Sequence, residues 1–288
     1  MSEFGPLVSA QWLAANLKKP DVKIIDGSWR MPGKPPARAD YATRHIESAV
    51  FFDIDEIADQ RSALPHMLPG ASEFETAAGA LGVSNEDRVV VYDDQGIFSA
   101  ARVWWTFRAM GHRSVAVLDG GLPKWLDEGG SVTDAKTTTV QADYQAQQQP
   151  HMVCDAGDVR AALAACDAAI VDARPAARFF GEAPEPRQSL RSGHMPGACS
   201  TPADALLNSD GTMRPPEEIA ALFSAAGADL EMPMITTCGS GVTAAVLCLA
   251  LETIGHDRHS LYDGSWTEWG DEGNAERDFP VSAGKEQR

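Results

Sequence analysis

The sequence predicts an α/β protein made of two similar halves in tandem, each with a mainly parallel sheet flanked by helices. The chain has 288 residues, of which 44% are hydrophobic, so it can supply two separate cores. Short apolar runs alternate with segments of helical periodicity in both halves, which is the pattern of parallel sheets covered on both faces. A set of residues also recurs from the first half to the second, as expected of a duplicated unit.

One set of residues recurs with the same sequence distance between each residue of the first half and its counterpart in the second. They are His112, Leu118-Asp119-Gly120-Gly121 and Trp125 in the first half, and His256, Tyr262-Asp263-Gly264-Ser265 and Trp269 in the second. Further upstream, Ile25-Asp26-Gly27-Ser28 is similar to Val171-Asp172-Ala173-Arg174, and His45-Ile46 to His194-Met195. Because Trp125, Trp269, His45 and His194 occur in matching places of both halves, we expect them to have structural roles.

Six short apolar runs are predicted to be buried strands. They cover residues 23–26, 89–92 and 115–118 in the first half and 169–172, 234–237 and 260–262 in the second. Three helix signals accompany them: a helical pattern from Val242 to Ile254, a helix opened by Pro216 with Glu217 and Glu218, and a capping box formed by Ser72 and Glu75.

A polar stretch separates the two halves. Between Ser131 and Pro150 the chain is rich in Thr, Gln, Ala and Asp and has little apolar periodicity, which is typical of a linker. We therefore predict an N-terminal domain over 1–135, a linker over 136–150 that runs along the surface without building core, and a C-terminal domain over 151–288.

The acidic composition limits the partners. A net charge of −17 argues against binding nucleic acid or an anionic membrane, because phosphate groups require a basic surface. No apolar stretch is long enough to span a bilayer, and the N-terminus lacks the pattern of a secretory signal. The five cysteines form no CxxC pair and no metal-ligand spacing, which predicts free thiols, a cytoplasmic location and no metal site. An anionic small substrate would need its own local positive charge.

The most informative segment is the loop after the predicted strand 234–237. Cys238 follows this strand directly, and Gly239-Ser240-Gly241-Val242-Thr243 leads into the next predicted helix. At such a junction the loop amides and the helix N-terminus can stabilise a thiolate. We therefore predict that Cys238 is a nucleophile, and the alternative is a core cysteine before a helix. The corresponding residue of the first half is Asp94, so that half lacks a nucleophile.

Cysteine-dependent phosphatases place a thiolate in a similar loop, but two residues argue against that activity here. Those enzymes need an arginine to clamp phosphate at the position that Ala244 occupies, and the residue before the cysteine is Thr237 where they have histidine. Phosphate transfer is therefore not expected.

The loop from Cys238 to Ala244 resembles the active-site loop of the 3-mercaptopyruvate sulfurtransferases, in the rhodanese superfamily. Other segments similar to family signatures extend over nearly the whole chain: 51–55, 66–70, 102–105, 118–121, 193–198 and 262–266. The resemblance implies two tandem rhodanese-like domains, of which the first lacks the catalytic cysteine. Thiosulfate-preferring relatives carry Arg or Lys after the cysteine, so Gly239 and Ser240 here imply mercaptopyruvate as the donor.

The resemblance also implies the substrate-binding residues. Arg178 and Arg187 match positions that bind the carboxylate and ketone of the substrate, a role that suits the planar, permanently charged guanidinium. The alternative is that both pair on the surface with neighbours such as Glu182 or Glu185. The loop residues Gly239, Gly241, Val242 and Thr243 are expected to hold the anionic sulfur through their amides.

A proton relay is implied as well. Ser240 matches a family serine thought to act with a histidine and an aspartate, which are His66 and Asp55 here. A histidine oriented by a carboxylate can exchange a proton near neutral pH. Alternatively, Asp55 is a turn or cap residue, and His66 is a loop residue packed between the domains.

The implied reaction is a two-step sulfur transfer without a metal or organic cofactor. The Cys238 thiolate takes the sulfur of a small anionic donor, 3-mercaptopyruvate, and releases pyruvate. The persulfide then gives its outer sulfur to an acceptor thiol such as thioredoxin or a small thiol, or to cyanide. Two alternatives remain open: a thiosulfate sulfurtransferase, and a non-catalytic thiol sensor or partner-binding module.

Overall fold

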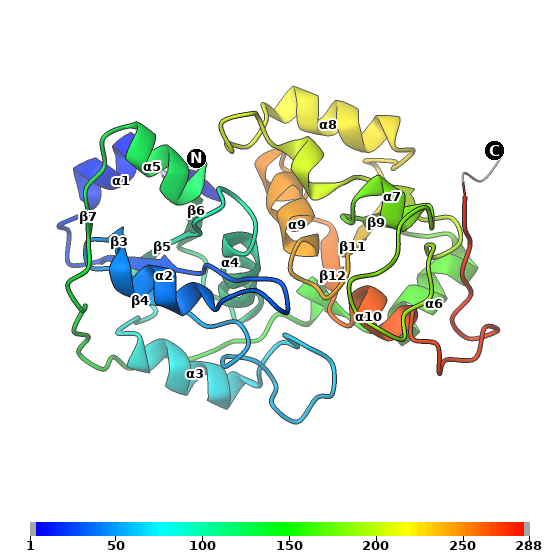
Figure 1. The fold of residues 1–288 in the computed structure, drawn as a ribbon, viewed down its shortest axis with the longest axis horizontal. Helices are drawn as coiled ribbons and strands as arrows, with labels where there is room; N and C mark the ends of the chain where they lie inside the picture. Colours follow the sequence, from blue (N-terminus) through cyan, green and yellow to red (C-terminus); the bar gives the residue numbers. More distant parts are fainter. Residues whose placement is uncertain (1–3, 285–288) are drawn as a thin grey trace. The chain divides into compact units, whose positions relative to one another are not determined.

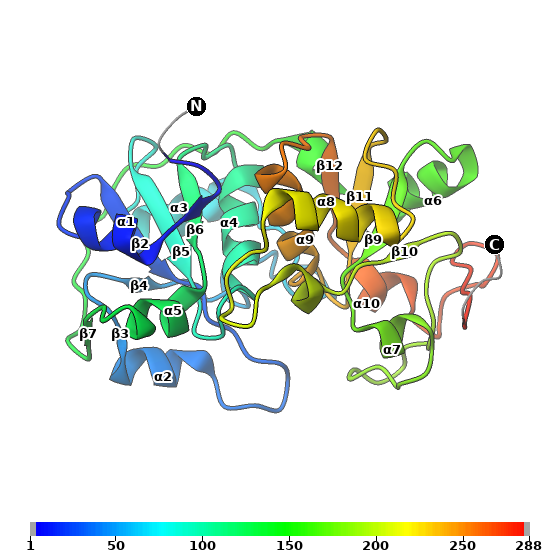
Figure 2. The same ribbon diagram turned by 90° about the horizontal axis from the view of Figure 1, so that it is seen from above.

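The computed structural model describes residues 4–284, which form two compact units. Unit 1 comprises residues 4–61, 68–149 and 207–213, and unit 2 comprises residues 62–67, 150–206 and 214–284. Each unit therefore includes one short segment that is distant in sequence from the rest of that unit. Figures 1 and 2 show the elements of both units in two views.

Unit 1 is built on a parallel sheet with the strand order β1-β6-β5-β2-β4. Its strands are β1 (Leu7–Val8), β2 (Val22–Asp26), β4 (Val50–Phe51), β5 (Arg88–Tyr92) and β6 (Val115–Leu118). The short strands β3 (His45–Ile46) and β7 (Val132–Thr133) pair separately and antiparallel. Residues on both faces of the sheet, such as Ile24 and Ile25 in β2, are buried, as expected of a sheet covered on both sides.

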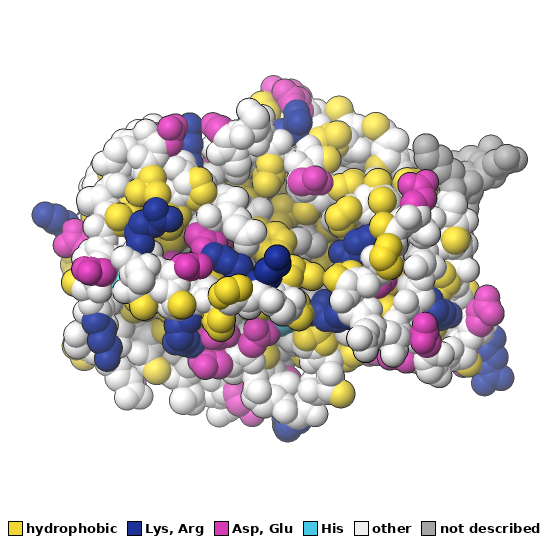
Figure 3. All heavy atoms as spheres, viewed as in Figure 1, with side chains coloured by type: hydrophobic (Ala, Val, Ile, Leu, Met, Phe, Trp, Pro, Cys, Tyr) yellow, Lys and Arg dark blue, Asp and Glu magenta, His cyan; other side chains and the backbone are white. Residues whose placement is uncertain are grey.

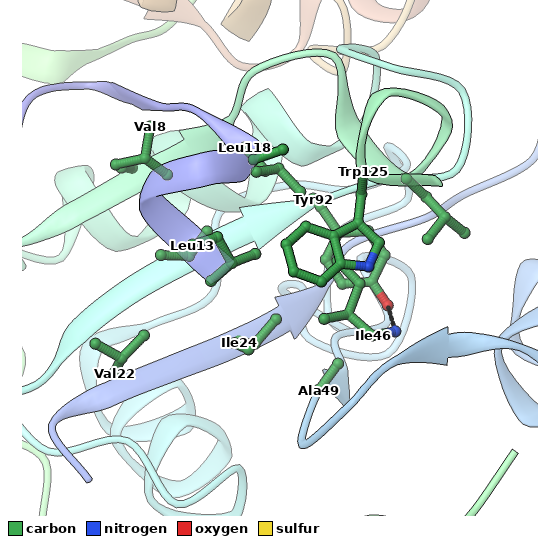
Figure 4. Close-up of a cluster of buried hydrophobic side chains, with 13 residues drawn as sticks. Val8, Leu13, Val22, Ile24, Ile46, Ala49, Tyr92, Leu118 and Trp125 are labelled. Carbon is green, nitrogen blue, oxygen red and sulfur yellow. Dashed lines mark hydrogen bonds between the residues drawn. The ribbon is translucent and has the colours of Figure 1, made fainter. Parts of the chain in front are cut away.

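Helices cover the two faces of this sheet. They are α1 (Ala10–Asn16), α2 (Ala37–Thr43), α3 (Ala71–Ala80), α4 (Ala100–Ala109) and α5 (Gly121–Asp127). On one face, Leu13 of α1 and Trp125 of α5 pack over Ile24, Tyr92 and Leu118, and the hydroxyl of Tyr92 accepts a hydrogen bond from the Ile46 amide at 3.2 Å (Figure 4). On the opposite face, α4 contacts β5 and β6 and packs with α3 through Phe74 and Phe107.

Unit 2 repeats this architecture, with the parallel order β10-β9-β11-β12-β8. Its strands are β8 (Val153–Cys154), β9 (Ala169–Asp172), β10 (Cys199–Ser200), β11 (Met234–Thr237) and β12 (His259–Tyr262). Each occupies the place of β1, β2, β4, β5 and β6 respectively, so the predicted duplication is confirmed.

The helices of unit 2 also correspond to those of unit 1. They are α6 (Ala156–Ala165), α7 (Ala176–Phe179), α8 (Pro216–Ala225), α9 (Ala244–Thr253) and α10 (Ser265–Trp269), with 3-10 turns η1 (Pro150–Met152) and η2 (Ala203–Leu206). α6 and α10 contribute to the core over Ile170, Ile235 and Tyr262, and α9 lies against β11 and β12 (Figures 1 and 2).

The predicted strands and the helix start at Pro216 agree with the structure, but two helix starts differ. The helix after Cys238 begins at Ala244 and not at Val242, because the loop needs two more residues to turn. The capping box at Ser72 is wrong: α3 begins at Ala71 after Gly70, so Ser72 already lies within the first turn. A capping box does occur at Asp155 and Asp158 in α6.

The polar stretch after β7 lies along unit 1. The Ala142 amide bonds to the Gly79 carbonyl at 3.0 Å and the Gln147 amide to the Met110 carbonyl at 2.9 Å. Tyr144 is only 6% exposed, and its ring stacks on His112 with centroids 5.8 Å apart. The expectation that this stretch builds no core is therefore wrong for Tyr144.

The residues expected to be structural are buried. Trp125 and Trp269 lie in the cores, and His45 and His194 are buried with ring nitrogens on backbone carbonyls. On the face drawn in Figure 3, acidic and basic side chains are interspersed. Within residues 4–284 no helix has the length and apolar character needed to cross a bilayer.

Candidate active site

Cys238 lies at the carboxyl end of β11, the middle strand of the unit 2 sheet. The loop 239–243 then leads into the N-terminus of α9. In parallel α/β sheets this end of the strands is where ligands bind, because loops and helix N-termini meet there. The side chain of Cys238 is nearly covered, with the residue 2% exposed.

The start of α10 holds the backbone of the cysteine loop. The Cys238 amide donates to Ser265 Oγ at 3.2 Å, and that hydroxyl donates to the Tyr262 carbonyl at 2.9 Å. In return, the Trp266 amide donates to the Cys238 carbonyl at 2.9 Å, and Thr267 donates to the Gly239 carbonyl through both its amide and its hydroxyl. The position of the cysteine backbone is therefore fixed from two sides.

Ser265 adopts a left-handed backbone conformation, with φ +50°, that non-glycine residues seldom take. The corresponding residue of unit 1 is Gly121, which has φ +56°. Unit 2 therefore keeps a serine where the fold favours glycine, at a conformational cost of about 1 kcal/mol. Its hydroxyl accepts the hydrogen bond from the Cys238 amide, a contact that glycine could not make.

The amides of the cysteine loop are available to bind an anion. Within the described part of the chain, the amides of Gly239, Ser240, Val242 and Thr243 donate no hydrogen bond to another protein group. They precede the ten-residue helix α9, whose N-terminus adds positive potential. Such a group of amides can hold a thiolate, a persulfide or a substrate anion.

Arg178, from α7, lies against this loop. A β-carbon placed on Gly239 would be 3.1 Å from Nη2 of Arg178, which is tighter than ordinary van der Waals contact. The guanidinium thus lies against Gly239, the residue after Cys238, and would have to move by a few tenths of an ångström to admit a side chain there. The positive charge of the loop face therefore comes from α7, since the loop itself carries no charged side chain.

Arg178 is held by a buried carboxylate. Its Nε lies 3.2 Å from Oε2 of Glu185, and its Nη2 also bonds to that oxygen. The side chain of Glu185 is 1% exposed and that of Arg178 is 19% exposed. Pairing with Glu185 was the alternative considered from the sequence, but it occurs in the interior of unit 2 and not on the surface.

The chain of charges continues to Arg174. Glu185 Oε1 accepts a hydrogen bond from Arg174 Nη1 at 2.8 Å. Arg174 also donates to both carboxylate oxygens of Asp172 and to the Gly193 carbonyl. Its guanidinium carbon lies 4.1 Å from the centre of the Trp266 ring. Burial alone would lower the pKa of Arg174, but the charges of Asp172 and Glu185 outweigh it and raise that pKa. Arg174 therefore braces the site as a permanent cation.

Arg187 meets His66. The two residues are far apart in sequence, yet Nη2 of Arg187 lies 3.4 Å from Nε2 of His66 within unit 2. Since a guanidinium only donates, this contact suits a neutral imidazole with its proton on Nδ1. His66 is buried and has φ +61°, a left-handed backbone conformation that few non-glycine residues adopt. The structure thus brings two of the predicted site residues together.

Asp55 belongs to unit 1. Its Oδ2 accepts from the indole nitrogen of Trp29 at 2.9 Å, and its amide bonds to Asp53 Oδ1 in a turn. The turn considered from the sequence is therefore present, together with a specific partner for the carboxylate. A relay through Ser240, His66 and Asp55 stays a prediction.

Unit 1 has a different arrangement at the position of the cysteine. Asp94 lies there and forms an ion pair with Arg30, with Oδ1 2.8 Å from Nη1. Both residues line a cavity of about 580 Å³ that also includes Asp26 and Ser28. This half therefore presents a paired carboxylate where unit 2 presents a thiol.

The roles of two residues at the site, Glu185 and Ser265, were not predicted from the sequence. Glu185 was considered only as a surface partner, although its place between Arg178 and Arg187 in the sequence was a usable signal. Ser265 was noted as part of a repeated segment, and its replacement of Gly121 was the signal that could have found it.

Comparisons with known proteins agree on the family. The rhodanese-like domain family matches residues 9–128 and again 155–272. The chain is 44% identical to mouse 3-mercaptopyruvate sulfurtransferase over 274 residues, covering 92% of each protein. It is 41% identical to bovine thiosulfate sulfurtransferase over 273 residues, again covering 92% of each.

A solved structure gives the same result. The crystal structure of SseA from Escherichia coli, described as a 3-mercaptopyruvate sulfotransferase, superimposes with a TM-score of 0.81 at 38% sequence identity, covering 91% of this chain and 99% of that one. The chain therefore belongs to the rhodanese superfamily and, within it, to the 3-mercaptopyruvate sulfurtransferase family of enzymes with two rhodanese-like domains in tandem.

Proposed function

We propose that the enzyme takes sulfur from 3-mercaptopyruvate onto Cys238 and passes it to an acceptor thiol. The observation that carries this proposal is the guanidinium of Arg178 against Gly239, beside a cysteine loop without charged side chains. Mercaptopyruvate has one carboxylate and one ketone, so a nearby guanidinium and a cluster of amides suit it. A loop with its own cations would suit a dianion better.

The first half-reaction forms a persulfide. The Cys238 thiolate attacks the sulfur of mercaptopyruvate, the bond between that sulfur and its carbon breaks, and the electron pair leaves on the carbon as the enolate of pyruvate. The enolate carbon takes up a proton, which balances the proton lost from the substrate thiol. Cys238 then carries the additional sulfur as an anionic persulfide, and the loop residues Gly239, Gly241, Val242 and Thr243 are proposed to hold it.

Charge develops on the departing enolate, and we infer that Arg178 and Arg187 stabilise it. Ser240, with His66 and Asp55, is the proposed route for the proton to the carbon. The contact between Arg187 and His66 supports this division, because the histidine proposed to exchange the proton lies 3.4 Å from the arginine proposed to bind the substrate.

The second half-reaction returns the enzyme to its starting state. An acceptor thiolate, from thioredoxin or a small thiol, attacks the outer sulfur and leaves with it, so that the Cys238 thiolate is restored. The cycle requires no metal or organic cofactor. Nucleic acid and membranes have no role in it, and the net charge of −17 supports that view.

We further propose that residues 1–135 and 151–288 are the two domains, joined by 136–150, and that only the second carries the catalytic cysteine. The family matches over 9–128 and 155–272 support this division. A cytoplasmic location is proposed from the five free cysteines, although an Arabidopsis relative is named as mitochondrial.

Mass spectrometry of the purified protein tests the reaction and the nucleophile together. After addition of mercaptopyruvate, the peptide that contains Cys238 should gain one sulfur while pyruvate appears in solution. Cys238→Ser should abolish both signals. Cys166→Ser, which removes an exposed free thiol, serves as the matched control and should abolish neither. A persulfide on another cysteine, or turnover by the Cys238→Ser protein, would contradict the mechanism.

A second donor is supported by the bovine relative, which is named as a thiosulfate sulfurtransferase. Comparing kcat/KM for the two donors decides between them, and a preference for thiosulfate would replace mercaptopyruvate in the proposal. A thiol sensor would instead show oxidation of Cys238 without release of pyruvate.

A further inference from the structure

The buried side chains behind Arg178 form one alternating row of charges. It runs from Asp172 at the end of β9, through Arg174 and Glu185, to Arg178 at the cysteine loop. The side chains of Asp172, Arg174 and Glu185 are each 1% exposed, so water screens their charges little. Two carboxylates balance two guanidinium groups in this row, which leaves Arg178 as a cation whose charge is largely matched.

Glu185 is the member of the row that touches both arginines. Its Oε1 accepts from Arg174 at 2.8 Å, and its Oε2 accepts from both Nε and Nη2 of Arg178. Arg174 is also fixed by Asp172 and by the Gly193 carbonyl, so it provides a rigid base for Glu185. Glu185 in turn sets where the guanidinium of Arg178 lies relative to Gly239.

From this arrangement we infer that Glu185 determines donor selectivity. It positions Arg178 at the cysteine loop and neutralises enough of its charge that the site favours a donor with one negative charge over a donor with two. This inference rests on the proposed function, because it concerns the binding of the donor to the same loop. Glu185 does not touch the donor, and it acts through Arg178.

The substitution Glu185→Gln separates this role from simple packing. Glutamine has nearly the same shape, but it removes one negative charge and offers only one acceptor oxygen to the two arginines. The net charge beside the cysteine loop rises by one, which favours a dianion more than a monoanion. A residue with only a structural role would lower the activity toward both donors alike.

The experiment measures kcat and KM for mercaptopyruvate and for thiosulfate in wild type, Glu185→Gln, Glu185→Asp and Glu182→Gln. Glu182 is an exposed neighbour, so Glu182→Gln makes the same change of charge away from the row. We expect Glu185→Gln to raise the ratio of kcat/KM for thiosulfate over mercaptopyruvate by about tenfold, mainly through KM, and 1 M salt to reduce that shift. Glu182→Gln should leave the ratio within about twofold of wild type.

Glu185→Asp keeps the charge but shortens the reach. We expect it to raise the KM for mercaptopyruvate while the donor ratio stays near that of wild type. This variant also keeps the inference open to refutation if Glu185→Gln does not fold: an unchanged KM in Glu185→Asp would exclude the positioning role.

The outcomes distinguish this inference from the proposed function. If wild type does not release pyruvate from mercaptopyruvate, the proposed function fails. If wild type does so, but folded Glu185→Gln has the same donor ratio as wild type, only the role of Glu185 is refuted. A changed ratio in Glu182→Gln of equal size would also refute it, because the effect would then come from overall charge.

Discussion

Asp26 offers a quantitative test of what the two halves of the duplication do differently. Asp26 and Asp172 end equivalent strands, and each accepts a hydrogen bond at 2.9 Å from the amide two residues later. In unit 2 that later residue is Arg174, whose guanidinium pairs with Asp172. In unit 1 it is Ser28, and within residues 4–284 no cation forms an ion pair with Asp26. Burial therefore raises the pKa of Asp26 to about 6.

The sign of the stability effect follows from this direction. Because the folded protein binds the Asp26 proton more tightly than the unfolded chain, the stabilisation by that proton is complete below about pH 4 and is lost as the pH rises through about 6. A rise of about two pKa units corresponds to about 3 kcal/mol of unfolding free energy at neutral pH. Asp26→Asn removes the ionisation while its amide oxygen can still accept from Ser28. We expect the variant to be more stable than wild type by up to about 3 kcal/mol at pH 7.5, with little difference near pH 4.

Urea unfolding from pH 4 to pH 8, followed by intrinsic tryptophan fluorescence, measures this difference. Exposed Asp134 provides the control, since Asp134→Asn should change stability by less than about 0.5 kcal/mol at every pH. An Asp26→Asn protein that is equally stable or less stable than wild type at pH 7.5 would contradict the raised pKa of Asp26. So would a stabilisation that is the same at pH 4 as at pH 7.5.

Three further predictions concern the second half of the chain. Gly239→Ala should raise the KM for mercaptopyruvate about tenfold in steady-state assays, because the added methyl displaces the Arg178 guanidinium; an unchanged KM would show that this contact is unimportant. Ser265→Ala leaves the buried Cys238 amide without its acceptor, so urea unfolding should report a loss of about 1–3 kcal/mol and persulfide formation should slow. Equal stability would argue against that hydrogen bond. Asp155→Ala removes the cap of α6 and should cost about 1 kcal/mol in the same assay without changing kcat, and a fall in kcat would link this remote helix to the chemistry.

The sequence predicted the repeated architecture well because strands in a covered parallel sheet are apolar on both faces. The runs at 115–118, 169–172 and 234–237 coincide with β6, β9 and β11. Local sequence predicted helix starts less well. Ser72 has a side chain suited to an N-cap, but the N-cap position of α3 is Gly70. Tyr144 was missed because a single aromatic residue in a polar stretch has no periodicity to reveal that it packs.

The loop that carries the nucleophile could be predicted from local sequence, and the buried charged residues that contact it could not. Cys238 and its glycines form one continuous segment, so their chemistry could be argued from adjacent residues. The burial of Glu185 depends on Arg174, Asp172 and Arg178 meeting in space. A charged residue in a loop is more often a solvated one, so only the folded arrangement distinguishes the two cases.

Each compact unit includes a short segment from the other half of the sequence, and this limits how the chain can be cut into fragments. Residues 62–67, which include His66, belong to unit 2, while residues 207–213 belong to unit 1, where the Met213 amide bonds to Asp119 at 2.7 Å and Asp210 pairs with Lys124. A protease cut within 136–149 would therefore not yield two complete units, because each fragment would keep a short segment that belongs to the other unit. The catalytic half cannot be excised intact as one stretch of sequence, so a working fragment would have to be rebuilt from both products of the cut.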